Sequence, residues 1–425
     1  MKVLWFSLSP CGSLRKNNTK RVIQGWMISL EDEVKKHTDI QLCVAYPSET
    51  EEDVFEYDGV TYYPIYNKRI TLSKWDKITN KKIDYDKHYN RLIPVMKEII
   101  ERVSPDIIHM HGTEEFMGLI SPFVQHIPVV YSIQGLLTSI EKKFFSGLTH
   151  EEITKNEQTI KRMITHSSID NEFRYFGYRS KREIEYLTNA KYVFGRTFWD
   201  KNITKLFNPN RQYFIINEIL RKEFYNNQWD KQEFGETFRI VSTMSPGQPY
   251  KGYETLIAAA EYLQKYAKCK FEWHVIGYYP DTRWVKLSEK ILNMRSAKNN
   301  IIFHGQLDSA DMLDILLKSD LYCHVSHIEN SPNSVCEAML LGLPIIASFA
   351  GGTSSLLDDR KEGVLVQDGD PYVLAGTILE MKDNFDLAKD MARKARVRAI
   401  ERHKPENVCN ELLTAYKSIL KMEGK

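Results

Sequence analysis

One stretch of the chain reads Ser326-His-Ile-Glu329-Asn-Ser-Pro-Asn-Ser-Val-Cys-Glu337-Ala-Met-Leu-Leu-Gly342-Leu-Pro344-Ile-Ile-Ala-Ser-Phe-Ala-Gly-Gly352. Its local signals predict a short helix followed by a buried strand. Ser331 is a good N-cap and Pro332 a good first helical residue, while Gly342 and Pro344 stop the helix. The apolar run after Pro344 then predicts a strand that ends before the Gly-Gly pair.

The expected start of this helix is a site for an anion. The amides of Asn333, Ser334 and Val335 are first-turn donors without helical partners, and the helix dipole favours negative charge there. Glu329 lies just before this site, and Glu337 lies about one and a half turns beyond it. Because carboxylates accept hydrogen bonds from sugar hydroxyls, the pattern suits a ligand with a diphosphate between two sugars, one held by each glutamate.

The spacing of the two glutamates is weak evidence by itself. Asp and Glu make up 56 of 425 residues, so acidic pairs at this spacing arise about seven times by chance. The plain alternative is a solvated pair at an ordinary helix end. The cap, the apolar helix, the Gly-x-Pro stop, the strand and the Gly-Gly pair together favour a ligand site.

This combination resembles the donor signature of the large retaining glycosyltransferase family 4, which has the two-domain GT-B architecture. The resemblance covers nearly the whole length and looks nearest to bacterial surface-polysaccharide transferases. It runs through His109-Met-His111-Gly-Thr-Glu114, Ser132-Ile-Gln134-Gly135-Leu136, Gly195-Arg196-Thr197-x-Trp199-Asp200, Asn217-Glu218-x-Leu220-Arg221 and Tyr250-Lys251-Gly252. It implies a nucleotide sugar in the second domain and an acceptor in the first. We expect neither a metal nor another cofactor, because Lys251 and the helix start would neutralise the diphosphate.

Strand and helix alternate twice along the chain, which is the pattern of doubly wound α/β sheets. A polar turn is expected at residues 12–18 and a helix at 20–36. Strands are predicted at residues 3–7, 40–45, 107–110, 129–133, 192–194, 239–243, 271–276, 301–304, 321–325, 345–348 and 364–366. Because such sheets bind ligands beyond the carboxyl ends of their strands, two of them would line a central cleft.

We therefore predict an α/β protein of the GT-B type, with two Rossmann-like, doubly wound domains that face this cleft. Residues 1–225 are the expected acceptor-binding domain and residues 237–404 the nucleotide-sugar-binding domain. The polar segment 226–236 is the expected linker. A C-terminal helix within 405–425 is expected to pack back on the first domain.

The loop after the first strand of the second domain is the next candidate site. Members of the family usually carry an Arg near that strand end and a Lys before a Gly, which together neutralise the diphosphate. Lys251 supplies the Lys, but no Arg occurs between residues 245 and 250. Either Arg196 or backbone donors at Ser245 and Gly247 would replace the Arg. The plain alternative for Lys251 is an exposed turn lysine.

The first domain contributes further candidates. Gly12 and Ser13 stand where the family's donor-facing Gly-Gly lies, although an ordinary tight turn explains a single glycine equally well. His111 should face the cleft at a strand end, and Gln134 stands where many relatives have His. Gln134 argues against a histidine base there. The resemblance implies that the leaving diphosphate takes the acceptor proton, and Lys251 and the helix start would be aimed at the developing charge.

Composition narrows the remaining possibilities. A net charge of +2 gives no support for nucleic-acid binding, and six scattered cysteines suggest reduced cytosolic thiols without a zinc framework. His109 and His111 lack ligand partners at metal spacing, so no metal site is expected. No apolar run spans a membrane. Aromatics and cations between residues 140 and 187 suit peripheral contact with anionic lipid, although solvated helices have the same composition.

The sequence thus predicts a cytoplasmic enzyme that moves a sugar, most simply from a UDP-linked donor, to a glycan or lipid-linked acceptor in surface-polysaccharide synthesis. Glu329 would hold the transferred sugar and Glu337 the ribose, with Lys251 on the diphosphate. Two alternatives stay open. One is a GT-B nucleotide-sugar 2-epimerase, which needs no acceptor, and the other is a noncatalytic nucleotide-sugar-binding partner of a transferase.

Overall fold

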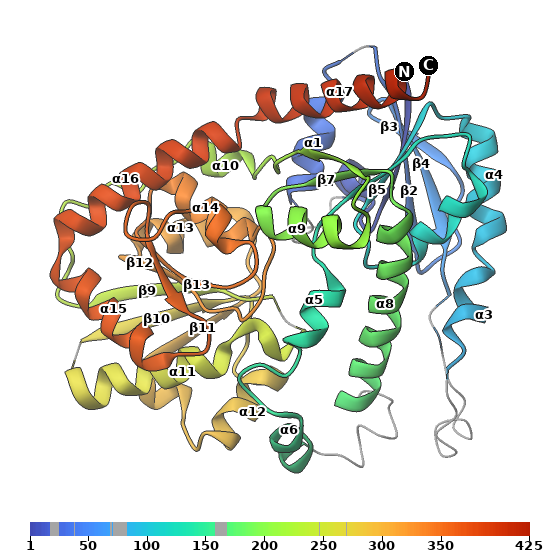
Figure 1. Ribbon diagram of the computed structural model, residues 1–425. Coiled ribbons are helices and arrows are strands. Elements are labelled where there is room, and N and C mark those ends of the chain that lie inside the picture. The colour runs from blue at the N-terminus through green and yellow to red at the C-terminus, as the bar shows by residue number, and fades with distance from the viewer. Residues whose placement is uncertain are drawn as a thin grey trace. The chain divides into compact units, whose positions relative to one another are not determined.

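The computed structural model of the chain describes residues 1–17, 25–37, 39–68, 70, 83–157, 168–245, 247–268 and 270–425. The chain divides into two compact units. The first unit comprises Met1–Glu141, Ile160–Ile219 and Lys404–Lys425, and the second comprises Lys142–Thr159 and Leu220–His403. Each unit is built on one sheet with helices packed against it (Figure 1). Among the described residues, no helix has the length and apolar character needed to cross a bilayer.

The first unit contains an eight-stranded sheet in the order β3-β4-β2-β1-β5-β6-β7-β8. All neighbouring strands are parallel except β3 and β4, which form an antiparallel hairpin. The strands are β1 Lys2–Ser7, β2 Gln41–Ser48, β3 Phe55–Tyr57, β4 Val60–Tyr66, β5 Ile107–His111, β6 Val129–Ser132, β7 Tyr192–Gly195 and β8 Gln212–Ile215. The helices are η1 Cys11–Asn17, α1 Gly25–Val34, α3 Tyr85–Asn90, α4 Ile93–Val103, η2 Phe116–Phe123, α5 Leu137–Lys142, α8 Ile169–Asn189, α9 Phe198–Phe207 and α17 Pro405–Met422.

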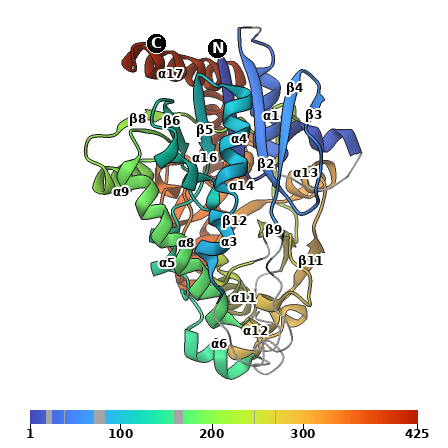
Figure 2. The same cartoon turned by 90° about the vertical axis from the view of Figure 1, so that its right-hand side faces the viewer.

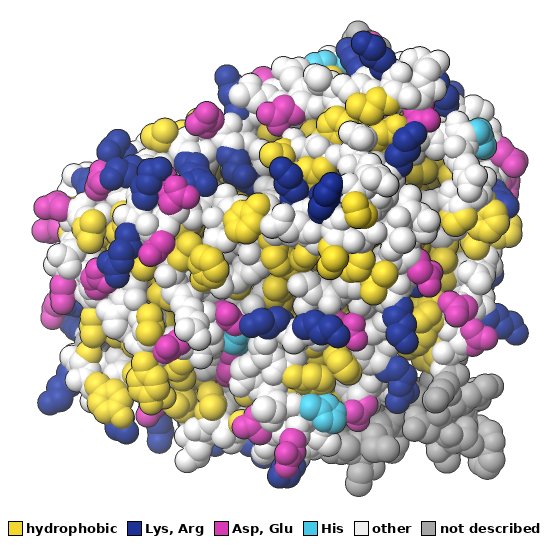
Figure 3. Space-filling view, viewed as in Figure 1, with side chains coloured by type: hydrophobic (Ala, Val, Ile, Leu, Met, Phe, Trp, Pro, Cys, Tyr) yellow, Lys and Arg dark blue, Asp and Glu magenta, His cyan; other side chains and the backbone are white. Residues whose placement is uncertain are grey.

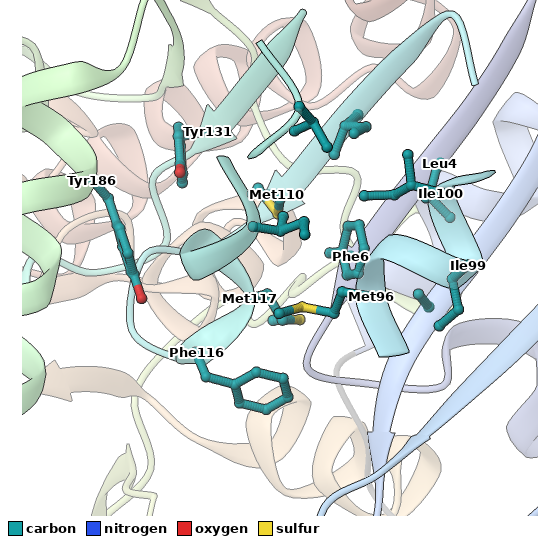
Figure 4. Packing of buried hydrophobic residues seen from close by; sticks show 14 of the residues in the cluster. Leu4, Phe6, Met96, Ile99, Ile100, Met110, Phe116, Met117, Tyr131 and Tyr186 are labelled. Atoms are coloured by element: carbon teal, nitrogen blue, oxygen red, sulfur yellow. The ribbon is translucent and has the colours of Figure 1, made fainter. Parts of the chain in front are cut away.

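Helices cover both faces of this sheet (Figures 1 and 2). One face packs on α4, η2 and α8 in a cluster that includes Phe6, Met96 and Ile100 (Figure 4). Each such side chain contributes about 1.5 to 3 kcal/mol when it is fully buried. The other face packs on α1 and α17. There the Tyr416 hydroxyl of α17 accepts a hydrogen bond from Trp5 Nε1 at 3.0 Å, which fixes the C-terminal helix on the first unit.

The second unit contains a six-stranded parallel sheet in the order β11-β10-β9-β12-β13-β14. The strands are β9 Phe238–Thr243, β10 Phe271–Ile276, β11 Ile301–Gly305, β12 Leu321–His324, β13 Ile345–Phe349 and β14 Val364–Gln367. The helices are α6 His150–Asn156, α10 Lys222–Tyr225, η3 Pro249–Lys251, α11 Tyr253–Tyr262, η4 Leu263–Ala267, α12 Arg283–Ile291, η5 Ser296–Asn299, α13 Ser309–Lys318, α14 Asn333–Leu341, η6 Thr353–Ser355, α15 Pro371–Asp383 and α16 Phe385–Arg402.

The predicted α/β class with two doubly wound, Rossmann-like sheets is confirmed. Each predicted strand is present, because buried parallel strands are continuous apolar runs that sequence alone reveals. The hairpin of β3 and β4 and the edge strand β8 were missed. The hairpin carries a readable signal, since Asp58 and Gly59 have φ values of 51° and 78° between the two strands, and Asp-Gly is a favoured hairpin turn.

Two details of the predicted domain division differ from the structure. The segment 226–236 is part of the second unit instead of a free linker, because Trp229 is buried and its Nε1 donates to the Ser319 carbonyl at 2.8 Å. The segment Lys142–Thr159, predicted to lie in the first domain, is grouped with the second unit. Contacts far apart in sequence hold it there, such as the ion pair between Arg283 and Glu157 at 2.5 Å.

Candidate functional site

Lys251 and Glu329 meet at the carboxyl end of the second sheet. Lys251 ends η3, which follows β9, and Glu329 lies in the loop after the neighbouring strand β12. The Nζ atom of Lys251 donates to Oε1 of Glu329 at 2.5 Å, and each side chain is 20% exposed. The two residues that the sequence assigned to catalysis are therefore in direct contact within one unit.

Two glycines allow the backbone to bring these residues together. Gly252 has a φ of 80°, and a Cβ there would lie 2.0 Å from the carbonyl oxygen of Val325. Gly351 has a φ of 55°, and its Cβ would lie 2.0 Å from the carbonyl oxygen of Glu329. A side chain at either position would push the loops apart, and positive φ is itself unfavourable for other residues. Gly252 and Gly351 thus allow the close backbone contacts that position the loops carrying Lys251 and Glu329.

The electrostatics keep both groups of the pair charged. Burial acts to raise the pKa of Glu329, but the charge of Lys251 and hydrogen bonds from Lys251 and Ser326 lower it overall. Burial acts to lower the pKa of Lys251, and Glu329 raises it overall. His324 stays neutral, because burial lowers its pKa to about 4. The site therefore presents an ammonium group and a carboxylate side by side.

The predicted start of α14 needs a correction. The helix begins at Asn333 with Pro332 as its N-cap, and no side chain caps it, so Ser331 is not the cap. The amide of Val335 donates to the Pro332 carbonyl at 3.0 Å and is not a first-turn donor open to a ligand. Within the described chain no backbone carbonyl accepts from the amides of Asn333 or Ser334. Of the three amides predicted to bind an anion, those of Asn333 and Ser334 are therefore the two that stay candidates.

Glu337 has a partner that sequence reasoning did not assign. Arg221 donates to both of its carboxylate oxygens. Burial raises the pKa of Glu337, and Arg221 opposes that rise. The sequence had named Arg221 as part of the resemblance but offered no partner for it, because the two residues are 116 positions apart.

Ser245 and Gly247, the proposed backbone replacements for the missing Arg, lie in the loop directly after β9. Ser245 is exposed. Gly247 has a φ of 155°, and nothing lies within 4 Å of where its Cβ would be. The loop is therefore open at these two positions, and their assignment to phosphate binding stays a prediction.

His327 is a second residue that the sequence did not single out. It is buried, and its Nε2 lies 2.6 Å from Oε1 of Glu254 while its Nδ1 lies 3.3 Å from Oδ2 of Asp368. Lys143 pairs with the same Asp368 oxygen at 3.2 Å. The amide of His327 also donates to the Tyr250 carbonyl at 2.9 Å. His327 thus ties the Glu329 loop to the Lys251 loop.

In the first unit, Gly12 and Ser13 lie in η1 after β1. The amide of Gly12 donates to Oε2 of the buried Glu31 at 3.0 Å, and a Cβ at Gly12 would lie 2.1 Å from the other carboxylate oxygen. Ser13 donates to the carbonyl of Pro10 at 2.7 Å. The absent side chain at residue 12 therefore makes room for Glu31, while donor binding by these two residues stays a prediction.

His109 and His111 lie on one face of β5 with ring centroids 3.8 Å apart. His109 is part of the core, because its ring nitrogens contact Tyr416 at 2.6 Å and Ser132 at 2.7 Å. Burial lowers the pKa of His109 to about 3, so it stays neutral. His111, at the strand end, is 3% exposed, and neither of its ring nitrogens has a hydrogen-bond partner in the described chain.

Gln134 and Glu114 extend this group of polar side chains. Gln134 follows β6, and its Nε2 is buried without a partner among the described residues. Glu114 accepts from the Gly135 amide at 2.9 Å through Oε1, while its buried Oε2 is likewise unpartnered. Burial, reinforced by Glu183, raises the pKa of Glu114 to about 7. The sequence quoted Glu114 only as part of a motif and gave it no role.

Arg196 lies after β7 in the first unit. Its Nε is 3.5 Å from Oε2 of Glu218, and its guanidinium lies 4.6 Å from the ring centroid of Trp26. The residue is 7% exposed. These contacts give Arg196 a structural role within the first unit, and its role at the diphosphate stays a prediction.

The basic and aromatic segment between residues 140 and 187 does not present its aromatics as one exposed face. Phe144 and Phe176 are buried, and Tyr175 and Tyr178 pack against Tyr85 with ring centroids 4.8 and 4.9 Å away. Residues 158–167 lie outside the described chain. On the face seen in Figure 3, Lys and Arg side chains instead gather along α16. Peripheral membrane contact therefore stays a prediction.

The family match of this chain lies in the second unit. Residues 225–398 match the family model described as glycosyl transferases group 1. An uncharacterized glycosyltransferase of Methanocaldococcus jannaschii is 28% identical over 243 aligned residues, and the match covers 51% of this chain and 59% of that protein. The chain therefore matches less than two thirds of this relative's length.

Solved structures share the whole architecture. The sucrose-phosphate synthase of Thermosynechococcus elongatus is 14% identical with a TM-score of 0.71, and the match covers 99% of this chain and 100% of that one. HepE of Anabaena, solved in complex with UDP and glucose, is 17% identical with a TM-score of 0.66 over 98% of this chain and 100% of that one. At this identity the likeness establishes the GT-B fold alone. The group 1 domain and the shared fold together support a glycosyltransferase of the GT-B type.

Proposed function

We propose that this protein is a retaining glycosyltransferase of family 4 that transfers a sugar from a UDP-linked donor to a glycan or lipid-linked acceptor in surface-polysaccharide synthesis. It would act in the cytoplasm, without a metal or other cofactor, where the acceptor is presented at the membrane. The contact between Lys251 and Glu329 at the carboxyl end of the second sheet carries the proposal.

The chemistry of this pair matches the needs of sugar transfer from a diphosphate. Lys251 has three N–H donors, so it can hold Glu329 and a phosphate oxygen together. As the sugar–phosphate bond breaks, negative charge grows on the diphosphate, and a fixed ammonium group stabilises that charge. Glu329, ionised beside it, is suited to hydroxyls of a sugar that becomes positively charged. Glu337 would accept from the ribose.

The acceptor would bind at the carboxyl ends of β5 and β6 in the first unit. His111, Glu114 and Gln134 each place a buried polar atom there without a hydrogen-bond partner in the described chain. Buried polar atoms are rarely left unpaired in native proteins, so such a group suits a polyhydroxylated ligand. Glu114 is added here to His111 and Gln134, which the sequence analysis placed in the first domain's part of the site.

The direct test is turnover with purified protein, a panel of UDP-sugars and short polysaccharide fragments as acceptors, with UDP release and glycan products both measured. Lys251→Ala should lower the rate at least about 100-fold, as removal of an oxyanion-stabilising donor does elsewhere. Lys286→Ala, at an exposed position of α12, is the matched control and should keep the wild-type rate. Equal rates in both variants would remove Lys251 from the active site.

The same assay separates the alternatives. A new sugar product from the donor alone, with no acceptor present, would assign the protein to the epimerases. Binding of UDP-sugars without any turnover would favour a noncatalytic partner. Accumulation of a glycosylated acceptor together with UDP supports the transferase.

A further inference from the structure

Arg182 is a buried guanidinium without a hydrogen-bond partner. It lies on α8, is 4% exposed, and none of its three guanidinium nitrogens has a hydrogen-bond partner within the described chain. The hydroxyl of Tyr186, one turn further along the helix, is buried and unpartnered in the same way. Residues four positions apart share one face of a helix. Two unused donor groups therefore lie together on the inner side of α8.

Neighbouring residues hold the Tyr186 ring in place. Burial raises the pKa of its hydroxyl, and the charge of Arg182 acts in the opposite direction. The Tyr186 ring packs where a Cβ on Gly118 would lie, 2.7 Å from its atoms, and it stacks on Tyr131 with centroids 6.1 Å apart. Figure 4 shows Tyr131 and Tyr186 together at one edge of the core cluster.

Arg182 makes cation–π contacts with aromatic rings, but these contacts do not provide hydrogen-bond acceptors for its N–H groups. The guanidinium carbon lies 4.7 Å from the ring centroid of Tyr89 and 4.7 Å from that of Tyr178. Contact with a ring face attracts the cation, whereas the N–H donors point along the edge of the guanidinium plane. Tyr89 is buried, whereas Tyr178 is half-buried and stacks on Tyr85, so the site adjoins the surface on the side of Tyr178.

The carboxylates on neighbouring positions are engaged elsewhere. Arg179, one turn earlier on α8, pairs with Glu115 at 3.0 Å. Glu183 accepts from the hydroxyls of Thr113 and Thr138, each at 2.6 Å. Arg182 therefore has no counter-charge of its own in the described part of the molecule, although a buried guanidinium is costly unless an anion pairs with it.

We propose that Arg182 and Tyr186 form an oxyanion site, which takes a carboxylate or phosphate group carried by the acceptor. The guanidinium fork matches two oxygens on one carbon or phosphorus, and the hydroxyl adds a third donor. The assignment of the oxyanion to the acceptor rests on the proposed function. The binding of an oxyanion at Arg182 and Tyr186 is independent of that function. The acceptor class is then an acidic glycan, or a phosphate-bearing glycan or lipid.

Binding of small probes tests this site without any need for turnover. Inorganic phosphate and glucuronate represent the two oxyanions, and glucose is the uncharged control. Calorimetry and thermal shift should show saturable binding of at least one oxyanion, and none of glucose, to the wild-type protein. Arg182→Met should weaken that binding about 10- to 100-fold, and Tyr186→Phe about 3- to 10-fold. Arg174→Met, at an exposed position of the same helix, should bind as the wild type does.

The proposal would be overturned if each anion bound to Arg182→Met and Tyr186→Phe as tightly as to the wild type. It would also be overturned if the wild type bound neither anion. The stronger of the two probes identifies the source of the oxyanion. If Arg182→Met does not fold, Arg182→Lys and Tyr186→Phe decide, because Lys keeps the charge and loses the fork. UDP binding, measured on the same samples, tests the donor site. A wild-type protein that binds an oxyanion but not UDP would contradict the proposed function and leave the oxyanion site in place.

Discussion

Arg221 donates two parallel hydrogen bonds to Glu337, from Nε to Oε1 and from Nη2 to Oε2, each 2.6 Å long. A bidentate pair of this kind fixes the plane and position of the carboxylate. Each oxygen keeps a second lone pair, so Glu337 can hold Arg221 and a ribose hydroxyl at once. The partner also means that substitution of Glu337 affects the fold of the second unit as well as ligand binding.

Glu337→Gln should weaken UDP and UDP-sugar binding alike, by about 10- to 100-fold, because the ribose is common to both ligands. It should also lower the free energy of unfolding by about 3 kcal/mol, since the Arg221 side chain, only 16% exposed, would lose its counter-charge. Calorimetry and denaturant unfolding measure the two effects. Glu380→Gln is the matched control, because Glu380 pairs with Arg360 on the surface. Its effect on stability should be at most about 1 kcal/mol. Normal UDP binding by Glu337→Gln would leave Glu337 with a structural role only.

Glu329→Gln should leave UDP affinity nearly unchanged and lower turnover strongly. The reason is that Glu329 is assigned to the transferred sugar, which free UDP lacks, and that its interaction tightens as the sugar becomes cationic. Calorimetry with UDP and initial rates with a UDP-sugar measure the two quantities. Equal losses of UDP affinity in Glu329→Gln and Glu337→Gln would falsify the assignment of separate roles.

Removal of divalent metal should leave activity intact. Lys251 and the start of α14 are assigned the task that a metal ion performs elsewhere, which is to neutralise the diphosphate. Initial rates before and after treatment with a chelator, together with metal analysis of the protein, test this. Loss of activity that Mg²⁺ or Mn²⁺ restores would contradict it.

The cluster around His327 should make stability fall as the pH rises. Burial acts to lower the pKa of His327, but hydrogen bonds and charges from Glu254 and Asp368 raise it overall. A raised folded-state pKa stabilises the fold fully below the unfolded value of about 6.5, and the contribution is lost as the pH rises through the folded value. Lys143 brings a positive charge to the cluster through its ion pair with Asp368.

His327→Gln should remove this dependence, because Gln keeps a polar group of similar size but does not titrate. Denaturant unfolding between about pH 6 and pH 9 should show a smaller decline in stability for the variant than for the wild type. His126→Gln, in an exposed loop of the first unit, is the control and should decline as the wild type does. The same slope in all three proteins would mean that folding does not raise the pKa of His327.

Gly252→Ala should destabilise the protein by at least about 1 kcal/mol and lower UDP-sugar turnover, because positive φ disfavours Ala and its Cβ would meet the Val325 carbonyl. Gly376→Ala, in the interior of α15 with nothing within 4 Å of its Cβ, should instead stabilise by about 0.5 to 1 kcal/mol. Thermal unfolding and initial rates test both. A neutral Gly252→Ala would show that the Lys251 loop does not depend on this close approach.

The sequence alone was sufficient for the α/β class, the predicted strands and the stretch from Glu329 to Gly352. These depend on local physics: apolar runs form buried strands, and Gly and Pro end helices. Even there the helix start was misplaced by one residue, because Ser331 was expected to cap and Pro332 to lie inside the helix. The contact of Lys251 with Glu329 was within reach, since both follow neighbouring strands of one parallel sheet.

Only the tertiary structure decided which side chains are partners across long stretches of chain. Arg221 and Glu337 are 116 residues apart, and Glu254 and His327 are 73 apart. It also decided that Lys142–Thr159 groups with the second unit and that Arg182 is buried without a counter-charge. The charge and the hydrogen-bonding groups of a side chain follow from the residue type, but its burial and its partners depend on how distant segments pack. Burial in turn determines the free-energy cost of an unpaired charge.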